Sequence, residues 1–320
     1  MQASDDIDPL WAPNPEDLPA WFHSALAVSR DDGFVEVAGT LIHYFRWGDP
    51  SHPPILMTHG FLAHARCFAF IAPFLAADFH VVAYDLSGMG DSAARPACDT
   101  RALGEEMIGV AEVLGLFDGP AKPVIIAHSF GSSVGLTAME IAGERFAGLI
   151  VCDLMILRPE VMEGRLRQGS SRPGSGDPDK PQRRYPDYPT ARGRYVLSPP
   201  QSAGEPFLMD YMAFHSLRQS NDEWTWKFDP EVFRQDKAGQ EWRGIGQRLV
   251  DVAGRKAIVY GEQSLLFTPD SANYVREIGG TNIPMVAIPH AAHHLMLDQP
   301  IAFTTALRTV LELWQREGSQ

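Results

Sequence analysis

Short apolar runs alternate with segments of helical periodicity over most of the chain. The runs have the character of buried strands and lie at 55–58, 81–84, 124–127, 149–152, 257–260 and 284–288. Helical spacing is found at 64–77, 100–116, directly after Ser129, at 269–278 and at 301–316. Buried strands separated by helices favour a parallel sheet that is covered on both sides. The pattern therefore predicts an α/β fold, with a mostly parallel twisted sheet and helices on both faces.

The first part of the chain departs from this rhythm. Residues 1–33 contain clustered proline and aspartate, which predicts an irregular N-terminal leader. The runs at 34–37 and 41–45, separated by Gly39 and Thr40, then favour an opening β-hairpin. The regular alternation begins after this hairpin.

A second interruption lies between residues 156 and 243. Residues 169–204 are crowded with glycine, proline, serine and arginine, which makes them too irregular for a sheet strand. Residues 207–217 have helical spacing, and aromatic side chains follow them. We therefore predict a main domain of residues 34–155 and 244–320, with a helical subdomain inserted at 156–243.

Composition and charge restrict the class of protein. Of the 320 residues, 45% are hydrophobic and 21% charged, which is typical of a chain that buries a core. A net charge of −13, from 40 acidic and 27 basic residues, disfavours nucleic acid and anionic membrane surfaces as partners. No run reaches the roughly 18 apolar residues of a membrane helix, and the chain starts with acidic residues, so we expect a cytoplasmic location.

Known cofactor and metal motifs are missing from the sequence. The three cysteines, Cys67, Cys98 and Cys152, form no CxxC pair, so neither a disulfide framework nor a zinc site is expected. Dinucleotide-binding, P-loop and HExxH motifs are also absent. We therefore expect no cofactor and no metal, and a small molecule as the partner. The sequence does not indicate an oligomeric state.

Ser129 lies where a buried strand turns into a helix, in the segment Ala127-His128-Ser129-Phe130-Gly131. A sharp strand-turn-helix needs small residues two positions before and two after the serine, and Ala127 and Gly131 meet this need. Such a turn exposes the hydroxyl near the helix N-terminus, which assists a weak nucleophile. A serine that only caps the helix is the alternative interpretation.

Two other segments contain groups that such a nucleophile needs. The strand at 55–58 ends in a loop that can aim the Phe61 amide, together with the Phe130 amide, at the oxygen of a reacting carbonyl. After the last strand, His293 is the candidate general base. Loops that follow parallel strands emerge at the same edge of a sheet, so we expect these groups to meet.

Four landmarks in this order resemble those of serine hydrolases of the α/β-hydrolase superfamily with an inserted cap. The landmarks are His59-Gly60-Phe61, residues 85–92, the turn at Ser129, and His293 seven positions before Pro300. The resemblance extends from about residue 34 to the end of the chain. It implies the α/β-hydrolase fold and a triad acid that pairs with His293, whereas residues 85–92 mark the fold rather than the chemistry.

The resemblance usually places this acid after the penultimate strand, where Ser264 stands in this chain. A serine cannot carry the negative charge that stabilises an imidazolium. Some members place the acid one strand earlier, and Asp153 ends that strand here. Asp153 is therefore the predicted partner of Ser129 and His293, with Glu262 as the alternative acid. A turn or cap carboxylate is the other interpretation of Asp153.

The remaining histidines near these positions need separate interpretations. His128 precedes the serine and either lines the substrate pocket or is an ordinary hydrogen-bonded residue. His290 and His294 flank His293 and would replace it as the base only if the register set by Pro300 is wrong.

We expect the cap to select the substrate. With His128, the predicted lining residues are Phe130, Leu154, Phe214, Trp224, Trp226 and Leu265. A medium-sized, mainly apolar acyl or alcohol group is favoured. The alternative is that the aromatic residues hold the cap to the main domain.

A serine nucleophile excludes the epoxide hydrolase and haloalkane dehalogenase chemistries of the superfamily, which need a carboxylate nucleophile. Hydrolysis of a carboxylic ester or lactone through an acyl-enzyme is the predicted reaction. Carbon–carbon bond hydrolysis of a diketone-type substrate would use the same triad. A ligand-sensing protein with slow turnover is a third interpretation.

Overall fold

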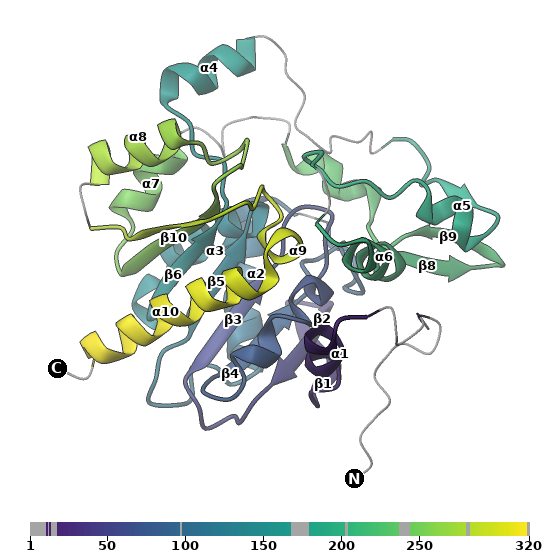
Figure 1. Ribbon diagram of the computed structural model, residues 1–320, viewed down its shortest axis with the longest axis horizontal. Helices are drawn as coiled ribbons and strands as arrows, with labels where there is room; N and C mark the ends of the chain where they lie inside the picture. Colours follow the sequence, from purple (N-terminus) through teal and green to yellow (C-terminus); the bar gives the residue numbers. More distant parts are fainter. Residues whose placement is uncertain are drawn as a thin grey trace.

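The computed structural model describes residues 11, 13, 18–96, 98–167, 179–201, 204–236, 244–279 and 282–318. At its centre is a sheet of eight strands in the order β1-β2-β4-β3-β5-β6-β10-β11 (Figure 1). The strands are β1 (Asp31–Val37), β2 (Thr40–Trp47), β3 (Pro54–Thr58), β4 (His80–Tyr84), β5 (Val124–His128), β6 (Gly148–Cys152), β10 (Arg255–Gly261) and β11 (Met285–Ile288). β2 pairs antiparallel with β1 and β4, and the pairs from β4 to β11 are parallel. The predicted fold class is confirmed.

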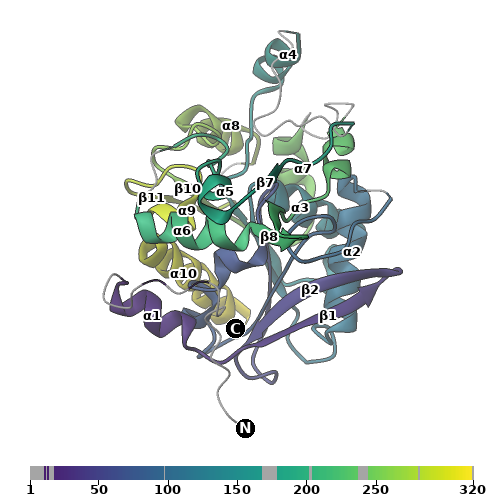
Figure 2. The same cartoon turned by 90° about the vertical axis from the view of Figure 1, so that its right-hand side faces the viewer.

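Helices cover both faces of this sheet, because successive residues of each inner strand point to opposite sides. Ile55 and Met57 of β3 belong to the core on the side of α1 and α10, whereas Leu56 belongs to the core that also contains residues of α2, α3, α7 and α8. Figure 2 shows α1 and α10 on one side of the molecule and α2 and α3 on the other. The helices around this sheet are α1 (Ala20–Leu26), α2 (Thr100–Val113), α3 (Phe130–Ala142), α7 (Ile245–Asp251), α8 (Pro269–Gly279), α9 (Leu295–Asp298) and α10 (Pro300–Gly318).

The segment predicted to be an irregular leader is more ordered than expected. Residues 1–33 include the whole of α1, and β1 begins at Asp31. Phe22, Ala25 and Leu26 are buried in the core, since their spacing places them on one face of the helix. Residues 1–10, 12 and 14–17 lie outside the described residues.

The predicted helix at 64–77 is wrong. Two short 3₁₀ turns, Ala65–Phe68 and Ala72–Phe74, replace it. Pro73 lies in the second turn. Because proline lacks an N–H and its ring clashes with the carbonyl four residues earlier, it interrupts an α-helix at this point.

Between β6 and α7 the chain forms a separate group of elements. They are α4 (Pro159–Arg167), β7 (Arg184–Tyr185), α5 (Tyr188–Arg192), α6 (Pro206–His215), β8 (Leu217–Ser220) and β9 (Glu223–Trp226), followed by a 3₁₀ helix at Pro230–Asp236. β7, β9 and β8 form a second, three-stranded antiparallel sheet. The insert therefore contains a small sheet in addition to the helices that were predicted.

β7 also corrects the expectation that residues 169–204 are too irregular for a strand. Its Tyr185 is in register with Trp224 of β9, and its ring packs against Trp226 of the same strand with 5.9 Å between centroids. Aromatic cross-strand contacts of this kind stabilise a short strand. Residues 168–178, 202–203 and 237–243 lie outside the described residues. The boundaries of the insert and its role as a cap stay predictions.

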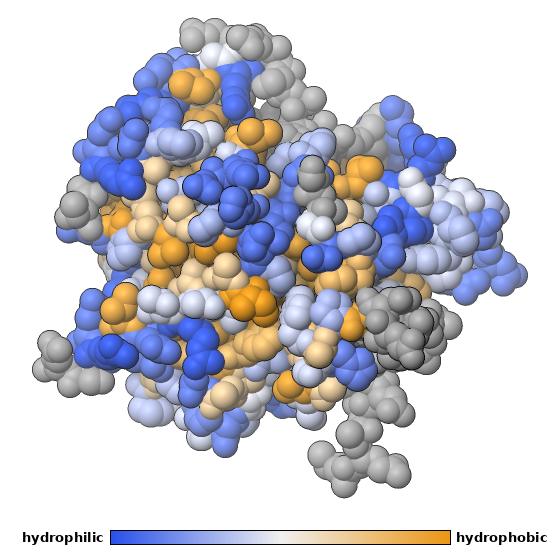
Figure 3. Space-filling model, in the orientation of Figure 1, coloured by the Kyte–Doolittle hydropathy of each residue, from blue (hydrophilic) through white to orange (hydrophobic). Residues whose placement is uncertain are grey.

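The surface differs between parts of the molecule. Hydrophilic residues cover much of the part formed by α5, β8 and β9, and hydrophobic residues gather nearer the middle of the same face (Figure 3).

In the described part of the chain, we find no helix with the length and hydrophobicity needed to cross a bilayer.

Candidate active site

Ser129 occupies a strained turn between β5 and α3. Its φ of 52° and ψ of −121° lie in a region that residues other than glycine rarely adopt. A Cβ atom on Gly131 would lie 2.5 Å from the backbone oxygen of His59, so glycine is required there. The Ser129 N–H donates to the Cys152 oxygen at 2.8 Å, and its side chain makes no capping bond to α3. The hydroxyl therefore does not serve as a helix cap.

His293 and Asp153 reach Ser129 from two other strand ends. His293 lies between β11 and α9, and its Nε2 is 2.9 Å from Ser129 Oγ. Its Nδ1–H donates to Asp153 Oδ1 at 2.8 Å. Asp153 directly follows β6 and is fully buried, and His293 is 2% exposed. The structure thus brings the three residues together in one line of hydrogen bonds.

Asp153 is held by groups other than His293. Its Oδ2 accepts a hydrogen bond from the Gly261 N–H at 2.8 Å, and its Oδ1 accepts one from the Ser264 hydroxyl at 2.6 Å. The Ser264 oxygen in turn accepts from the Leu266 N–H at 3.1 Å. From the sequence, Ser264 was interpreted only as a missing charge. The unused signal was that a hydroxyl can donate to a carboxylate on the neighbouring strand.

The alternative acid, Glu262, is the first residue after β10 and is exposed. Its Oε2 accepts a hydrogen bond from the His290 N–H at 3.3 Å, and His290 is also exposed. Neither residue belongs to the line formed by Ser129, His293 and Asp153.

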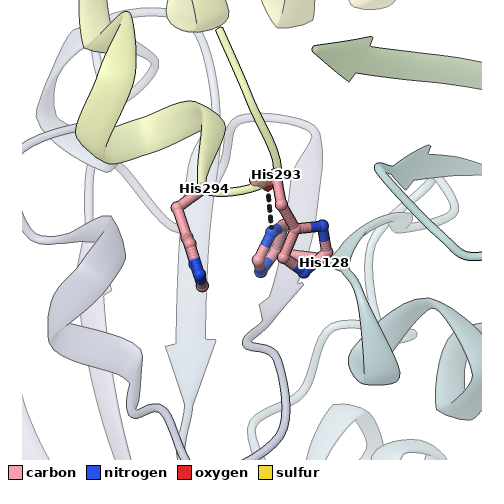
Figure 4. Close-up of side chains that lie close together, drawn as sticks. All are labelled: His128, His293 and His294. Atoms are coloured by element: carbon pink, nitrogen blue, oxygen red, sulfur yellow. Dashed lines mark hydrogen bonds between the residues drawn. The ribbon is translucent and has the colours of Figure 1, made fainter. Parts of the chain in front are cut away.

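His128 and His294 lie beside His293 (Figure 4). The His128 Nε2–H donates to the backbone oxygen of His293 at 2.9 Å, so this buried side chain supports the turn that carries His293. Burial lowers the pKa of His128 well below its usual range and that of His294 to about 3. Both rings are therefore uncharged at neutral pH.

Asp298 also fixes the turn around His293, although the sequence analysis does not identify it. Its Oδ2 accepts a hydrogen bond from the Ala292 N–H at 2.8 Å. The Gln201 amide donates to the Asp298 carboxylate at 2.8 Å, and its Oε1 accepts from the His294 N–H at 3.1 Å. Because Gln201 belongs to the insert, the insert is connected directly to the turn that holds His293.

Phe61 and Phe130 flank the turn at Ser129. Phe61 follows β3, Phe130 is the first residue of α3, and their rings meet edge to face with 5.5 Å between centroids. His59 fixes the loop before Phe61, since its Nε2 accepts a hydrogen bond from the Leu86 N–H at 3.0 Å. The N–H groups in the first turn of a helix point beyond its N-terminus. The two amides as an oxyanion hole stay a prediction.

The residues predicted to line a substrate pocket have different surroundings. Leu154 is fully buried in the core, whereas Leu265 is 70% exposed. The rings of Phe214 and Trp224 contact each other, with 6.4 Å between centroids. Trp226 packs against tyrosine rings of the same insert. These contacts favour a packing role for the three aromatic side chains.

A second charged cluster, centred on the buried His43 and Asp85, holds the loop at residues 85–92. The His43 ring donates to Asp85 Oδ2 through Nδ1 and to Asp32 Oδ1 through Nε2, both at 2.8 Å. The Asp91 N–H also donates to Asp85 Oδ2, at 2.9 Å. Burial opposes a charge on His43, but the hydrogen bonds to the two carboxylates outweigh it and raise its pKa to about 9. This cluster is a structural support for the loop.

The sequence matches the model of a known family and is similar to that of a known protein. A sequence model of the alpha/beta hydrolase family matches residues 55–307. The dihydrolipoyllysine-residue acetyltransferase component of the acetoin cleaving system of Pseudomonas putida is 32% identical over 267 residues, which cover 82% of this chain and 64% of that protein. The chain thus spans less than two thirds of the length of this relative.

The fold is similar to those of solved structures. E-2-(acetamidomethylene)succinate hydrolase superposes with a TM-score of 0.70 and 16% identity over 89% of this chain and 100% of that one. A novel esterase from Mycobacterium tuberculosis superposes with a TM-score of 0.66 and 16% identity over 92% of this chain and 97% of that one. The strand order, the turn at Ser129 and the match to the family over most of the sequence agree, and the chain belongs to the alpha/beta hydrolase family.

Proposed function

We propose that this chain is a serine hydrolase that cleaves a carboxylic ester or a lactone through an acyl-enzyme intermediate. The supporting observation is the line of hydrogen bonds in which Ser129 Oγ lies 2.9 Å from His293 Nε2 and His293 Nδ1 lies 2.8 Å from Asp153 Oδ1. A carboxylate that holds the Nδ1 proton leaves the Nε2 lone pair facing the hydroxyl. This arrangement turns a serine into a nucleophile.

In the first half of the reaction, His293 Nε2 takes the Ser129 proton while Oγ attacks the carbonyl carbon of the substrate. The carbonyl oxygen becomes an oxyanion, for which the Phe61 and Phe130 amides are the proposed donors. His293 then gives its proton to the departing alkoxide as the ester carbon–oxygen bond breaks. An alcohol is released and the acyl group stays on Ser129. For a lactone, the alcohol remains part of the same acyl chain.

In the second half, a water molecule attacks the acyl carbon and gives a proton to His293. The bond from this carbon to Ser129 Oγ breaks, and His293 returns the proton to the serine as the carboxylic acid leaves. His293 is cationic in both halves of the reaction. Asp153 stabilises this cation without becoming protonated itself.

Membership of the alpha/beta hydrolase family and the esterase among the structural neighbours support a hydrolase. We propose that the insert takes part in substrate selection, because Gln201 connects it to the His293 turn. The sequence-based preference for a medium-sized, mainly apolar acyl or alcohol group stays part of this proposal. Carbon–carbon bond hydrolysis of a diketone would use the same three residues. The likeness of fold does not separate these substrates.

The test is a substrate screen with wild-type protein and Ser129→Ala in parallel. p-Nitrophenyl esters of graded acyl length, several lactones and a β-diketone are compared by kcat/KM. The proposal predicts that esters or lactones are turned over by the wild type alone. Turnover of the diketone alone would replace ester cleavage by carbon–carbon cleavage. No turnover of any substrate, together with a ligand-dependent melting temperature, would favour a sensing protein.

A further inference from the structure

We propose that His128, His293 and His294 form a binding site for a divalent transition-metal ion such as Zn²⁺, and that the bound ion inhibits the hydrolase. One ring nitrogen of each of the three histidines lies within 4.8 Å of the others, and Figure 4 shows the three rings side by side. Two imidazole ligands of a tetrahedral Zn²⁺ are about 3.4 Å apart, given Zn–N bonds of about 2.0–2.1 Å. Closing the cluster therefore needs side-chain shifts of about 1 Å.

The hydrogen bonds on the other side of each ring prepare the three histidines as ligands. His293 donates its Nδ1–H to Asp153, and His128 donates its Nε2–H to the backbone oxygen of His293. His294 is hydrogen bonded to the backbone of Pro199. Metal-binding histidines typically donate their second N–H to a carboxylate or carbonyl in this way. Each neutral ring then keeps a lone pair on its remaining nitrogen.

The remaining nitrogen of His294 provides independent support. Its Nε2 is buried and has no hydrogen-bond partner among the residues that the structure describes. A buried polar atom without a partner is destabilising. A metal ion shared with His128 and His293 would satisfy this atom.

The second cluster of potential ligands has no ring nitrogen that lacks a hydrogen-bond partner. His43, Asp85 and Asp91 are also close enough to hold an ion. However, both ring nitrogens of His43 already donate to carboxylates, and Asp85 accepts from His43 and from the Asp91 N–H. An ion there would have to break a hydrogen bond of His43 to a carboxylate, whereas an ion at His128, His293 and His294 displaces only the Ser129 hydroxyl from His293. The cluster at His128, His293 and His294 is therefore the better candidate.

Inhibition follows from the identity of one ligand. His293 Nε2 is the atom 2.9 Å from Ser129 Oγ, and a lone pair bound to a metal cannot accept the serine proton. This consequence rests on the proposed function, whereas binding of the ion does not.

The experiment measures binding and activity separately. Chelator-treated protein is titrated with ZnCl₂ by calorimetry and with CoCl₂ by visible absorption, because tetrahedral Co²⁺ absorbs strongly. His294→Gln and His128→Gln each remove one ligand, and His290→Gln is the matched control, an exposed histidine on the same turn. Ser129→Ala keeps all three ligands. Thermal melting checks the folding of every variant.

We expect one ion per chain in the wild type, His290→Gln and Ser129→Ala. His294→Gln and His128→Gln should bind at least tenfold more weakly. Zn²⁺ should inhibit ester hydrolysis reversibly, with EDTA restoring the rate, and inhibition of a folded ligand variant should need at least tenfold more Zn²⁺. Absence of stoichiometric binding, or equal binding by the ligand variants and His290→Gln, would overturn the proposal. Binding without any ester turnover would leave the metal site intact and would instead contradict the proposed function.

Discussion

Replacing Asp153 with asparagine tests the electrostatic part of the proposed mechanism. An asparagine at this position has one oxygen and one NH₂ group in place of two carboxylate oxygens. The Gly261 N–H, 2.8 Å from Asp153 Oδ2, is a fixed backbone donor, whereas the Ser264 hydroxyl can rotate. The amide oxygen of Asp153→Asn will therefore face Gly261, and its NH₂ will face His293.

This orientation reverses the tautomer of His293. The ring must accept at Nδ1 and carry its proton on Nε2, which faces Ser129 at 2.9 Å and can then no longer take the serine proton. In known triads, the wrong tautomer lowers turnover by about 10⁴-fold. We therefore expect a loss of about 10³ to 10⁴ in kcat/KM, which corresponds to about 4 to 5.5 kcal/mol of transition-state stabilisation.

The assay is kcat/KM for the best ester of the screen, with the melting temperature as a check on folding. The matched controls are Glu262→Gln and Ser264→Ala, which we expect to stay within about tenfold of the wild type because both leave the Asp153 charge in place. An Asp153→Asn protein that is folded and within tenfold of the wild type would show that the Asp153 carboxylate does not set the tautomer of His293. A folded Glu262→Gln protein without measurable turnover would instead identify Glu262 as the acid that pairs with His293.

Further substitutions test contacts of the candidate active site and of the His43 cluster. His293→Ala should lose about three or more orders of magnitude in ester turnover, whereas His290→Ala should retain the wild-type rate; the reverse result would show that the register set by Pro300 is wrong. Asp153→Asn combined with Ser264→Asp should recover part of the lost turnover, since Ser264 Oγ lies 2.6 Å from the carboxylate that is removed; a double variant as inactive as Asp153→Asn would contradict this. Gly261→Ala should lower both the melting temperature and turnover, because its Cβ would lie 2.1 Å from the backbone oxygen of Ala292, beside His293; an unchanged melting curve would be inconsistent with this packing. The pKa of His43 is raised from 6.5 to about 9, so its contribution to stability is complete below about pH 6.5 and is lost as the pH rises through about 9; the difference in melting temperature between wild type and His43→Gln should shrink over that range, and a difference that grows would show that the sign is wrong.

The strands of the main sheet could be predicted because their side chains are buried on both faces. Runs such as 124–127 and 149–152 stand out in the sequence for this reason. The structure shows them as β5 and β6, which end beside Ser129 and Asp153. Chain order and strand ends were therefore sufficient to select Ser129 and His293 as candidates, whereas Asp153 was selected through the resemblance to the superfamily.

Elements that depend on tertiary contacts were harder to predict. α1 is short, and the burial of its Phe22 against the core outweighs the prolines around it. β7 has only two residues and depends on its pairing with β9. The hydrogen bond from Ser264 to Asp153 joins two strands that are far apart in the sequence, so no local pattern encodes it.

The proposal that Ser129 is a nucleophile activated by His293 is tested most directly by covalent labelling. A fluorophosphonate probe is incubated with the folded wild type, Ser129→Ala and His293→Ala, and the modified peptide is identified by mass. We predict one label per chain on Ser129, no label on Ser129→Ala, and labelling of His293→Ala that is slower by at least about two orders of magnitude. An unlabelled wild type, or a Ser129→Ala protein that is labelled as fast as the wild type, would contradict the claim.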